Sequence, residues 1–337
     1  MTRLGVFVGE DKWLFFKEIY RDLKGRYQTE VYRPKRYRLP VLGDEVNRWA
    51  SRRRLKNMLR RNDICFFEWA SDLLVEASHA PKSCVVVTRL HSFELYAWAP
   101  KVNWDNVDRV ILVSRAMERR LTGLYPRLAG RTVVVPNGVS LDKFSPRGHA
   151  RARLNMGTVC RITPIKRVYE LVLTCYALHE RGHDVHLHVA GDHDDDGRYA
   201  VAIERLIDRL DLRAFVHLHG PVADVPAWLE QVDVFVSNSY WEGHQVALVE
   251  AMATGCYCLA HFWDGAEEIL PPENLYVTDV ELQDKLLQYW AQPETEQQAA
   301  QREMRRRVEE RCDVDQQLPR IRQTIETALQ GKAKIAG

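Results

Sequence analysis

The chain has 337 residues, of which 46% are hydrophobic and 28% charged, so it carries enough apolar side chains for a large core, and its length favours two domains over one. The sequence contains no run of about eighteen apolar residues, so no transmembrane helix is expected. The first residues also lack the long apolar core of a signal peptide. Seven cysteines form no CxxC pair and several lie in apolar runs, which indicates a reducing, cytoplasmic environment without a disulfide framework.

Short β-branched runs alternate with helical patterns over the first half of the chain. Strands are expected at RLGVFVG (3–9), TEVYR (29–33), DICFFEW (63–69), SCVVVTRL (83–90), VDRVILVS (107–114) and TVVVPNG (132–138). Helices are expected at SDLLVEASHA (71–80) and RAMERRLTGLY (115–125). This alternation predicts βαβ units and a parallel sheet.

A strongly basic segment, 33–61, lies between the second and third of these strands. It contains eleven Lys and Arg residues against two acids, a net charge of +9, whereas the whole chain carries only +2. Part of it has helical character, with Trp49, Leu55, Met58 and Leu59 available for an apolar stripe. Such a segment is either a solvated helix that covers the first domain or a surface for an anionic partner.

The pattern restarts in the second half. Strands are expected at NMGTVCRI (155–162), VHLHVAGD (185–192), AFVHLHG (214–220), DVFVSNS (233–239) and GCYCLAHF (255–262). Helices are expected at 167–182, 199–211, 225–232 and 245–254, and again from Pro293 onward. Periodicity lapses at 139–154. We therefore predict an α/β protein with two doubly wound domains, 1–145 and 146–315, and a C-terminal helix (316–337) that packs back toward the first domain.

Two glutamates stand out near the apolar helix expected at 245–254. Glu250 lies inside it, and Glu242 lies in the loop before it, about 12 Å away at 1.5 Å per residue. The unpaired amides of the first helical turn (244–247) are suited to an anion. The alternative is that Glu250 pairs with a buried arginine while Glu242 only caps the helix.

Two cations follow the first strand of the second half. Arg161 ends that strand and Lys166 precedes a helix, so together they are suited to a diphosphate. Ordinary surface cations are the alternative, although positive charge is unfavourable at a helix start. In the first half, His91 lies just past an apolar strand, where it is either a site residue or a structural histidine.

Together these stretches resemble the family 4 glycosyltransferases, enzymes of the GT-B fold in which two Rossmann-like domains face each other across a cleft. The resemblance rests on the glutamate pair in EGHQVALVEAMATG (242–255), the cation pair in RITPIK (161–166), the PNGV turn (136–139) with Phe144, and GAEEIL (265–270), which places Glu268. It covers most of residues 85–270.

The resemblance implies a role for each matched residue. Glu250 would hold the ribose of a nucleotide sugar, Arg161 and Lys166 would neutralise its diphosphate in place of a metal ion, and His91 would touch the sugar. Donor-sugar contacts are also implied for Glu242, for Gly9, and for the stretch Gly243, His244, Gln245 and Val246. The family often has Gly-Phe-Gly where this chain has Gly243-His244-Gln245, and Gly-Gly where this chain has Gly9-Glu10, so the sugar is left open.

The implied activity is that of a hexosyltransferase. It would be retaining and metal-independent, with no cofactor, and would move a sugar to a glycan or lipid-linked acceptor in polysaccharide or glycolipid synthesis. An anionic membrane is a further candidate partner, through residues 33–61, which would place the protein on the cytoplasmic face of a membrane. Nucleic acid is not expected, because no reader motif is present. The alternatives are an epimerase or phosphorylase of the same fold, or a non-catalytic nucleotide-sugar-binding subunit.

Two further motifs resemble metal sites. DHDDDG (192–197) lacks the spaced ligands of a calcium loop, so a solvated acidic turn is expected. HLH occurs at 186–188 and again at 217–219, which places two histidines on one face of each strand. If these strands are neighbours, four histidines would gather; we expect polar strand residues rather than a zinc site.

Overall fold

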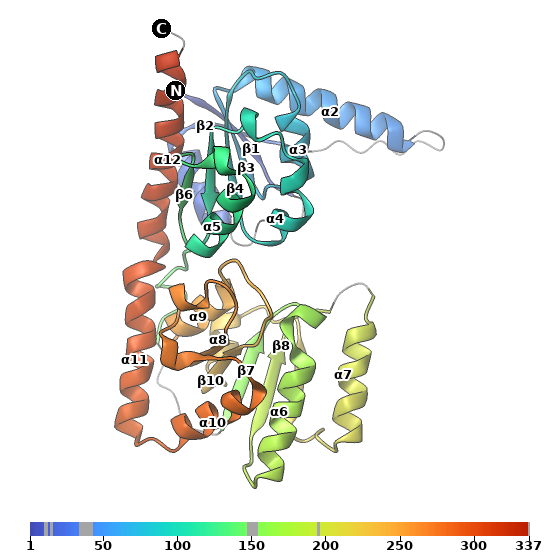
Figure 1. The fold of residues 1–337 in the computed structure, drawn as a ribbon, viewed down its shortest axis with the longest axis vertical. Coiled ribbons are helices and arrows are strands. Elements are labelled where there is room, and N and C mark those ends of the chain that lie inside the picture. Colours follow the sequence, from blue (N-terminus) through green and yellow to red (C-terminus); the bar gives the residue numbers. More distant parts are fainter. Residues whose placement is uncertain (10–12, 14–15, 34–42, 147–153, 194–195, 336–337) are drawn as a thin grey trace. The chain divides into compact units, whose positions relative to one another are not determined.

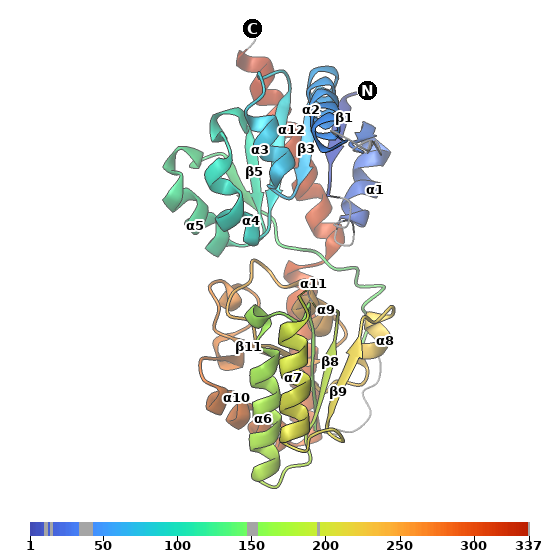
Figure 2. The same ribbon diagram turned by 90° about the vertical axis from the view of Figure 1, so that its right-hand side faces the viewer.

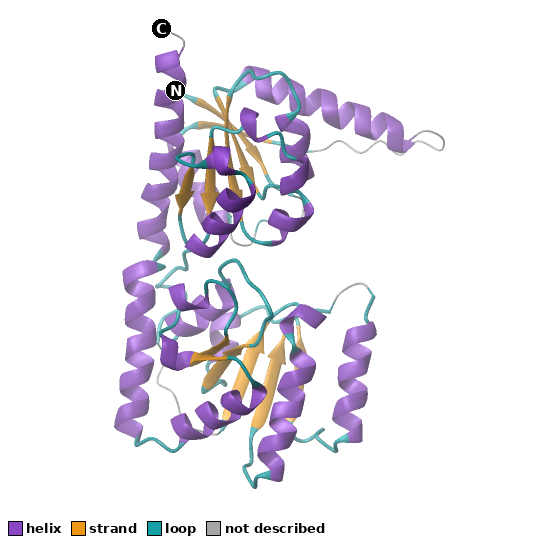
Figure 3. Cartoon of the chain, in the orientation of Figure 1, coloured by secondary structure: helices purple, strands orange, loops and turns teal. Residues whose placement is uncertain are grey.

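The computed structural model describes residues 1–9, 13, 16–33, 43–146, 154–193 and 196–335. The chain divides into two compact units. The first comprises Met1–Asn137 with Asp315–Gly337, and the second comprises Gly138–Val314. Each unit has its own parallel sheet with helices on both faces (Figure 3).

The sheet of the first unit has the order β2-β1-β3-β4-β5-β6. Its strands are β1 (Arg3–Phe7), β2 (Gln28–Val31), β3 (Ile64–Glu68), β4 (Val85–Leu90), β5 (Arg109–Leu112) and β6 (Thr132–Val134). Its helices are α1 (Lys17–Arg26), α2 (Gly43–Arg61), α3 (Asp72–Ser78), α4 (Phe93–Ala97), α5 (Arg115–Leu124) and most of α12 (Val314–Ile335). All residues of β3 and β4 are buried, as expected for central parallel strands covered on both faces.

The last helix, α12, completes the core of the first unit. Ile321, Ile325 and Ala328 are buried in one cluster with Leu4 and Val6 of β1. Their spacing of three and four residues places them on one face of the helix, which explains how a segment otherwise rich in polar residues packs against the sheet.

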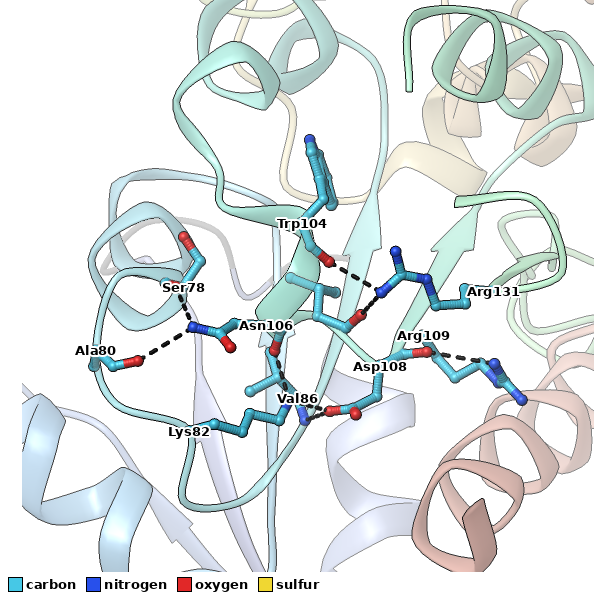
Figure 4. Close-up of polar contacts among 10 residues, drawn as sticks. Ser78, Ala80, Lys82, Val86, Trp104, Asn106, Asp108, Arg109 and Arg131 are labelled. Carbon is cyan, nitrogen blue, oxygen red and sulfur yellow. Dashed lines mark hydrogen bonds and ion pairs between the residues drawn. The ribbon is translucent and has the colours of Figure 1, made fainter. Parts of the chain in front are cut away.

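Polar contacts fix the end of this sheet where β4 and β5 begin (Figure 4). Asp108 accepts hydrogen bonds from the amide of Val86 (2.6 Å) and from the ammonium of Lys82 (2.5 Å). The guanidinium of Arg131 donates to the carbonyl oxygens of Trp104 (3.1 Å) and Val107 (3.0 Å). The amino ends of the strands are thus tied by structural contacts, while the carboxyl ends are the edge where ligands bind in such sheets.

The sheet of the second unit has the order β12-β11-β10-β7-β8-β9. Its strands are β7 (Asn155–Val159), β8 (His186–Ala190), β9 (Val216–Gly220), β10 (Val234–Ser237), β11 (Tyr257–His261) and β12 (Leu275–Tyr276). Its helices are α6 (Val168–Glu180), α7 (Arg198–Arg209), α8 (Val225–Leu229), α9 (Val246–Ala253), α10 (Asp279–Trp290) and α11 (Glu294–Arg311). One face packs on α8, α9 and α11, and the other on α6, α7 and α10; α6 and α7 lie side by side (Figure 2).

These two sheets confirm the predicted α/β architecture of two doubly wound domains. Each of the eleven runs expected as strands overlaps a strand, and only β2 begins outside its run, by one residue. The short strand β12 and the helices α1, α4 and α10 were not expected. Among the described residues, no helix combines the length and the hydropathy needed to cross a bilayer.

Residues 43–61 of the basic segment form α2, and residues 34–42 lie outside the described residues. Leu55, Met58 and Leu59 are buried in the core of the first unit, as a covering helix requires. Trp49 does not share that face: it is 61% exposed, and the Arg53 guanidinium lies 5.3 Å from its ring centre. The predicted four-residue stripe is therefore wrong at Trp49. Figure 1 shows the first turns of α2 extending outward from the sheet.

The two HLH strands are neighbours, as the sequence suggested. In the register of β8 and β9, His188 lies opposite His217. Nδ1 of His186 is 3.1 Å from Nε2 of His217, and Nδ1 of His188 is 3.1 Å from Nε2 of His219, so the imidazoles pair with one another. In the part of the chain that the structure describes, no three His, Cys, Asp or Glu side chains are arranged to hold a metal ion. Residues 194–195 of the acidic turn lie outside that part.

Candidate active site

The second unit has a switch point at the centre of its sheet. From β7 the chain winds outward through β8 and β9, and it then returns to β10 on the other side of β7 and winds through β11 and β12. The chain therefore leaves β7 and β10 toward opposite faces of the sheet, with α6 after β7 on one face and α9 after β10 on the other. Ligands of open α/β sheets bind at such a point.

An ion pair joins these two loops. Nζ of Lys166, in a short 3₁₀ turn after β7, contacts Oε1 of Glu242, in the loop after β10. The Ser239 hydroxyl donates to the same oxygen at 2.7 Å. Because the two charged side chains are only 20% and 12% exposed, solvent screens this pair little. The partner of Glu242 is thus a lysine, and the predicted alternative, a simple helix cap, is wrong.

Arg167, the next residue after Lys166, stabilises the two loops that carry the ion pair. It adopts a left-handed backbone conformation (φ 52°), and its buried guanidinium donates to Asp279 at 2.8 Å and to Oδ1 of Asn238 at 3.2 Å. Asn238 in turn donates to the Arg167 carbonyl at 3.0 Å. These contacts fix the loops that carry Lys166 and Glu242. Arg167 and Asn238 were not predicted as site residues, although Arg167 directly follows Lys166 in the sequence.

Arg161 lies two residues beyond β7 and is exposed. Its side chain makes no ion pair or hydrogen bond with another described residue. The preceding residue, Cys160, lies against Gly191 at the end of β8: a Cβ on Gly191, whose φ is 133°, would come within 1.8 Å of the Cys160 carbonyl oxygen. Only glycine permits this approach, which holds the loop of Arg161 against the sheet edge.

Helix α9 begins at Val246, with Gln245 as its N-cap residue. No side chain caps its first amides, and the buried Oε1 of Gln245 has no hydrogen-bond partner among the described residues. Gly243 and His244 are also buried, and Nε2 of His244 is 3.8 Å from Sγ of Cys312. The helix starts two residues later than the predicted amide set (244–247), so its first turn begins four residues after Glu242 in the chain.

Glu250 lies one helical turn from the end of α9. Its carboxylate forms no hydrogen bond or ion pair with any residue that the structure describes, so the predicted alternative of a buried arginine partner is wrong. Burial raises its pKa to about 7, although the nearby charge of Lys143 acts in the opposite direction. Glu250 is half-buried, and a carboxylate that loses part of its water without gaining a partner is costly, so a ligand that supplies hydrogen-bond donors would lower that cost.

The other two predicted site residues lie in the first unit. Gly9 is half-buried and follows β1, and residues 10–12 after it lie outside the described residues. His91 follows β4; it is buried, and its Nε2 lies 2.9 Å from Oε1 of Glu68. Arg89 of β4 donates to the same oxygen at 2.8 Å. Both residues lie at the carboxyl edge of the first sheet.

The predicted residues thus form two groups. Lys166 and Glu242 are in direct contact, and Arg161 and Glu250 belong to the same loop and helix system of the second unit. Gly9 and His91 belong to the first unit. Glu268, in a 3₁₀ turn (Ala266–Glu268) after β11, is half-buried.

Comparisons with known proteins agree with this organisation. The model of glycosyltransferase family 4 matches residues 6–143, and the model of glycosyl transferases group 1 matches residues 153–292. A putative glycosyltransferase, EpsF of Bacillus subtilis, is 31% identical over 156 residues, which are 46% of this chain and 40% of EpsF. The chain therefore aligns with less than half the length of that relative.

Two solved structures share the fold over nearly the whole chain. Anabaena Alr3699/HepE in complex with UDP and glucose has a TM-score of 0.80 at 20% identity and covers 97% of this chain and 100% of its own. Sucrose-phosphate synthase from Thermosynechococcus elongatus has a TM-score of 0.77 at 14% identity, with coverage of 98% and 100%. With one family model matched to each unit and these neighbours in fold, the chain belongs to the family 4 glycosyltransferases and has the GT-B fold.

Proposed function

We propose that this protein transfers a hexose from a nucleotide diphosphate sugar to a hydroxyl acceptor, with retention at the anomeric carbon and without a metal ion. One observation carries the proposal: at the switch point of the second sheet, the ion pair of Lys166 and Glu242 precedes a helix whose first turn has no side-chain cap, and in that helix the Glu250 carboxylate has no partner among the described residues. A ligand with both phosphate and hydroxyl groups could bind the cation, the helix amides and the carboxylates together.

Glu250 is the proposed ribose-binding residue. Two vicinal hydroxyls would donate to its carboxylate and replace the hydrogen bonds with water that burial removes. Because such bonds favour the ionised form, the bound nucleotide would also lower the raised pKa of Glu250. The position of a lone carboxylate within an apolar helix then has a functional reason.

Arg161 and Lys166 are the proposed diphosphate-binding cations. Arg161 is exposed, and its side chain has no partner among the described residues, so its guanidinium is available for bidentate binding of phosphate oxygens. Lys166 is held by Glu242, which keeps its charge in place before the ligand arrives. Fixed cations stabilise the negative charge that develops on a departing diphosphate, and this role would make a metal unnecessary.

Glu242 and residues 243–246 are the proposed contacts of the donor sugar, together with Gly9 and His91 from the first unit. UDP-glucose is the donor to test first, because UDP and glucose are bound in the similar Anabaena structure. The proposed acceptor is a glycan or lipid-linked glycan.

Nucleotide binding tests this proposal without knowledge of the acceptor. Thermal unfolding should be followed with UDP, GDP and ADP in excess, each in EDTA. One of them should raise the unfolding temperature by several degrees, since a ligand at about 100 times its Kd stabilises the folded state by about 2.7 kcal/mol. Absence of a shift with all three, or a shift that requires added manganese, would refute the proposed metal-independent nucleotide site.

We further propose that the outward-extending turns of α2 attach the protein to the cytoplasmic face of a membrane with anionic lipids. Val46 (37%) and Trp49 (61%) are exposed there, next to the exposed Arg48 and Arg53. Basic residues near such a surface contribute about 1 kcal/mol each, and tryptophan is favoured at membrane interfaces.

Co-sedimentation with liposomes tests this attachment. Binding is expected on vesicles with anionic lipid at low salt and should be much weaker at high salt or on neutral vesicles. Reversing Arg48 and Arg53 to glutamate should lower the bound fraction at least several-fold. The matched control reverses Arg205 and Arg209, which are exposed on α7 of the other unit. Equal loss of binding in both variants would contradict a role for α2.

A further inference from the structure

The buried carboxylate of Glu68 forms a hydrogen bond with the imidazole of His91. Glu68 is the last residue of β3 and is 2% exposed. Its Oε1 is 2.8 Å from Nη1 of Arg89 and 2.9 Å from Nε2 of His91, whereas its Oε2 is buried without a hydrogen-bond partner among the described residues. The guanidinium of Arg89 and the imidazole of His91 therefore bind the same oxygen of Glu68.

The charge of Glu68 determines where the proton of His91 lies. Burial alone would raise the pKa of Glu68, but the Arg89 guanidinium and the hydrogen bond from His91 outweigh it, so this pKa is lowered and the group is a carboxylate. A carboxylate only accepts hydrogen bonds, so Nε2 of His91 must carry the proton. In the neutral ring Nδ1 then has a free lone pair.

That second nitrogen is available to a ligand. Nδ1 of His91 makes no hydrogen bond with any described residue, and it is not among the buried polar atoms that lack a partner. It therefore retains access to solvent, although the side chain as a whole is only 10% exposed. The imidazole is therefore bound to Glu68 through Nε2, while Nδ1 remains accessible to a ligand.

The face and the backbone of His91 are fixed as well. The Trp69 ring stacks on the imidazole with 4.0 Å between ring centres and an angle of 27°. Trp69 has a positive φ of 76°, which is strained for a bulky residue, and its amide donates to the Arg89 carbonyl at 3.1 Å. The His91 amide donates to Oε1 of Glu94 at 3.1 Å. Local strain of this kind persists where the surrounding contacts over-determine a functional geometry.

We infer that Glu68 is a positioning residue for the sugar-transfer reaction: it keeps the proton of His91 on Nε2, so that Nδ1 faces the substrate as a neutral acceptor for a hydroxyl of the donor sugar. This inference rests on the proposed function, because it assigns a substrate group to Nδ1. A neutral acceptor suits this place, since it binds a hydroxyl without adding positive charge near a sugar that becomes cationic in the transition state.

The tautomer can be measured in the free protein. In protein labelled with ¹⁵N-histidine, long-range ¹H–¹⁵N spectra distinguish protonated from unprotonated ring nitrogens, and the signals of His91 are assigned by their loss in His91→Gln. The spectra are recorded at a pH high enough for the ring to be neutral, and there we expect a protonated Nε2, with slow hydrogen exchange, and an unprotonated Nδ1. A proton on Nδ1, or a rapid mixture of both forms, would overturn the inference whether or not any sugar is transferred.

Kinetics test the role in the reaction. The amide that Glu68→Gln introduces can accept from or donate to Nε2, so both tautomers become possible and turnover of UDP-glucose should fall about 10- to 100-fold, with the donor KM changed less than about threefold. Glu68→Asp, which restores the charge, should recover part of the loss. The control is Glu76→Gln, the same chemical change at a half-buried carboxylate of this unit that pairs with Arg52 at 3.1 Å.

The outcomes separate the two proposals. Equal kinetics for Glu68→Gln and Glu76→Gln, or a single unchanged His91 tautomer in Glu68→Gln, would overturn the positioning role. If the wild-type protein turns over no nucleotide sugar, the proposed function fails and the role in the reaction fails with it, even where the spectra show the expected tautomer. Should Glu68→Gln not fold, the wild-type spectrum still decides where the proton lies.

Discussion

Replacing Lys166 with alanine is expected to lower turnover about 100-fold or more. The ammonium is fixed by Glu242, so it meets the leaving diphosphate without reorganisation, and removal of one such preorganised contact typically costs 10²- to 10³-fold. Arg161→Ala is expected to have a loss of the same order. Release of nucleoside diphosphate from the donor is the measurement.

The control for this prediction is Lys285→Ala. Lys285 belongs to the same unit, and its ammonium donates to the Glu273 carbonyl at 2.6 Å, away from the switch point. Its replacement should leave turnover within about twofold of the wild type, as expected for a surface contact of little energetic weight. If the two lysine variants lose activity equally, a specific role of Lys166 in binding the diphosphate is wrong.

Replacing Glu250 with glutamine is expected to weaken nucleotide binding and to stabilise the free protein. A neutral amide loses the charge-assisted bonds to the ribose, which are worth about 1.5–3 kcal/mol, so Kd should rise about 10- to 100-fold. In the absence of a nucleotide, however, the amide avoids the cost of a buried carboxylate. Calorimetric titration with the preferred nucleotide and chemical unfolding measure the two effects.

The gain in stability depends on pH. The pKa of Glu250 is raised from 4.5 to about 7, so the unfolded chain releases this proton before the folded one does. The contribution of the protonated group is fully present below pH 4.5 and is lost as the pH rises to about 7. The difference in unfolding free energy between Glu250→Gln and wild type should therefore grow across this window and reach about 3 kcal/mol above pH 7.

Glu204→Gln provides the comparison for this effect. Glu204 is exposed on α7 of the same unit, so its neutralisation should change neither the pH dependence of stability nor the nucleotide affinity. A different outcome for Glu250→Gln, a large loss of stability with unchanged affinity, would indicate that the carboxylate has a structural partner and not a ligand.

Much of the fold was predictable because central parallel strands are apolar on both faces. The runs that became β3 and β4 are continuous, and turns or polar residues end them. The strand β12 was missed because it has two residues, too few to show a period. Trp49 was assigned to the buried stripe of α2 because periodicity identifies a helix face but cannot tell where the helix leaves the domain.

The place of Lys166 and Glu242 in the fold was predictable, but their contact was not. The positions of Lys166 and Glu242 after strands placed both at the carboxyl edge, yet 76 residues separate them, and only the strand order, with β10 beside β7, brings their loops together. The contacts between Arg167 and Asn238 depend on the left-handed backbone conformation of Arg167, which no sequence pattern predicts. Similarly, nothing in the sequence shows that Glu68 reaches His91 from the neighbouring strand.

Nucleotide release from a panel of UDP-, GDP- and ADP-sugars in EDTA tests the central claim most directly. The sugar donors are incubated with the wild-type protein and with Lys166→Ala, and transfer to water or to an added acceptor is followed through the nucleoside diphosphate released. We expect one nucleotide class to be turned over by the wild type in EDTA, at a rate at least about 100 times that of the variant. Turnover of no donor, or turnover that appears only when manganese is added, would contradict a metal-independent glycosyltransferase that uses Lys166 to bind the leaving diphosphate.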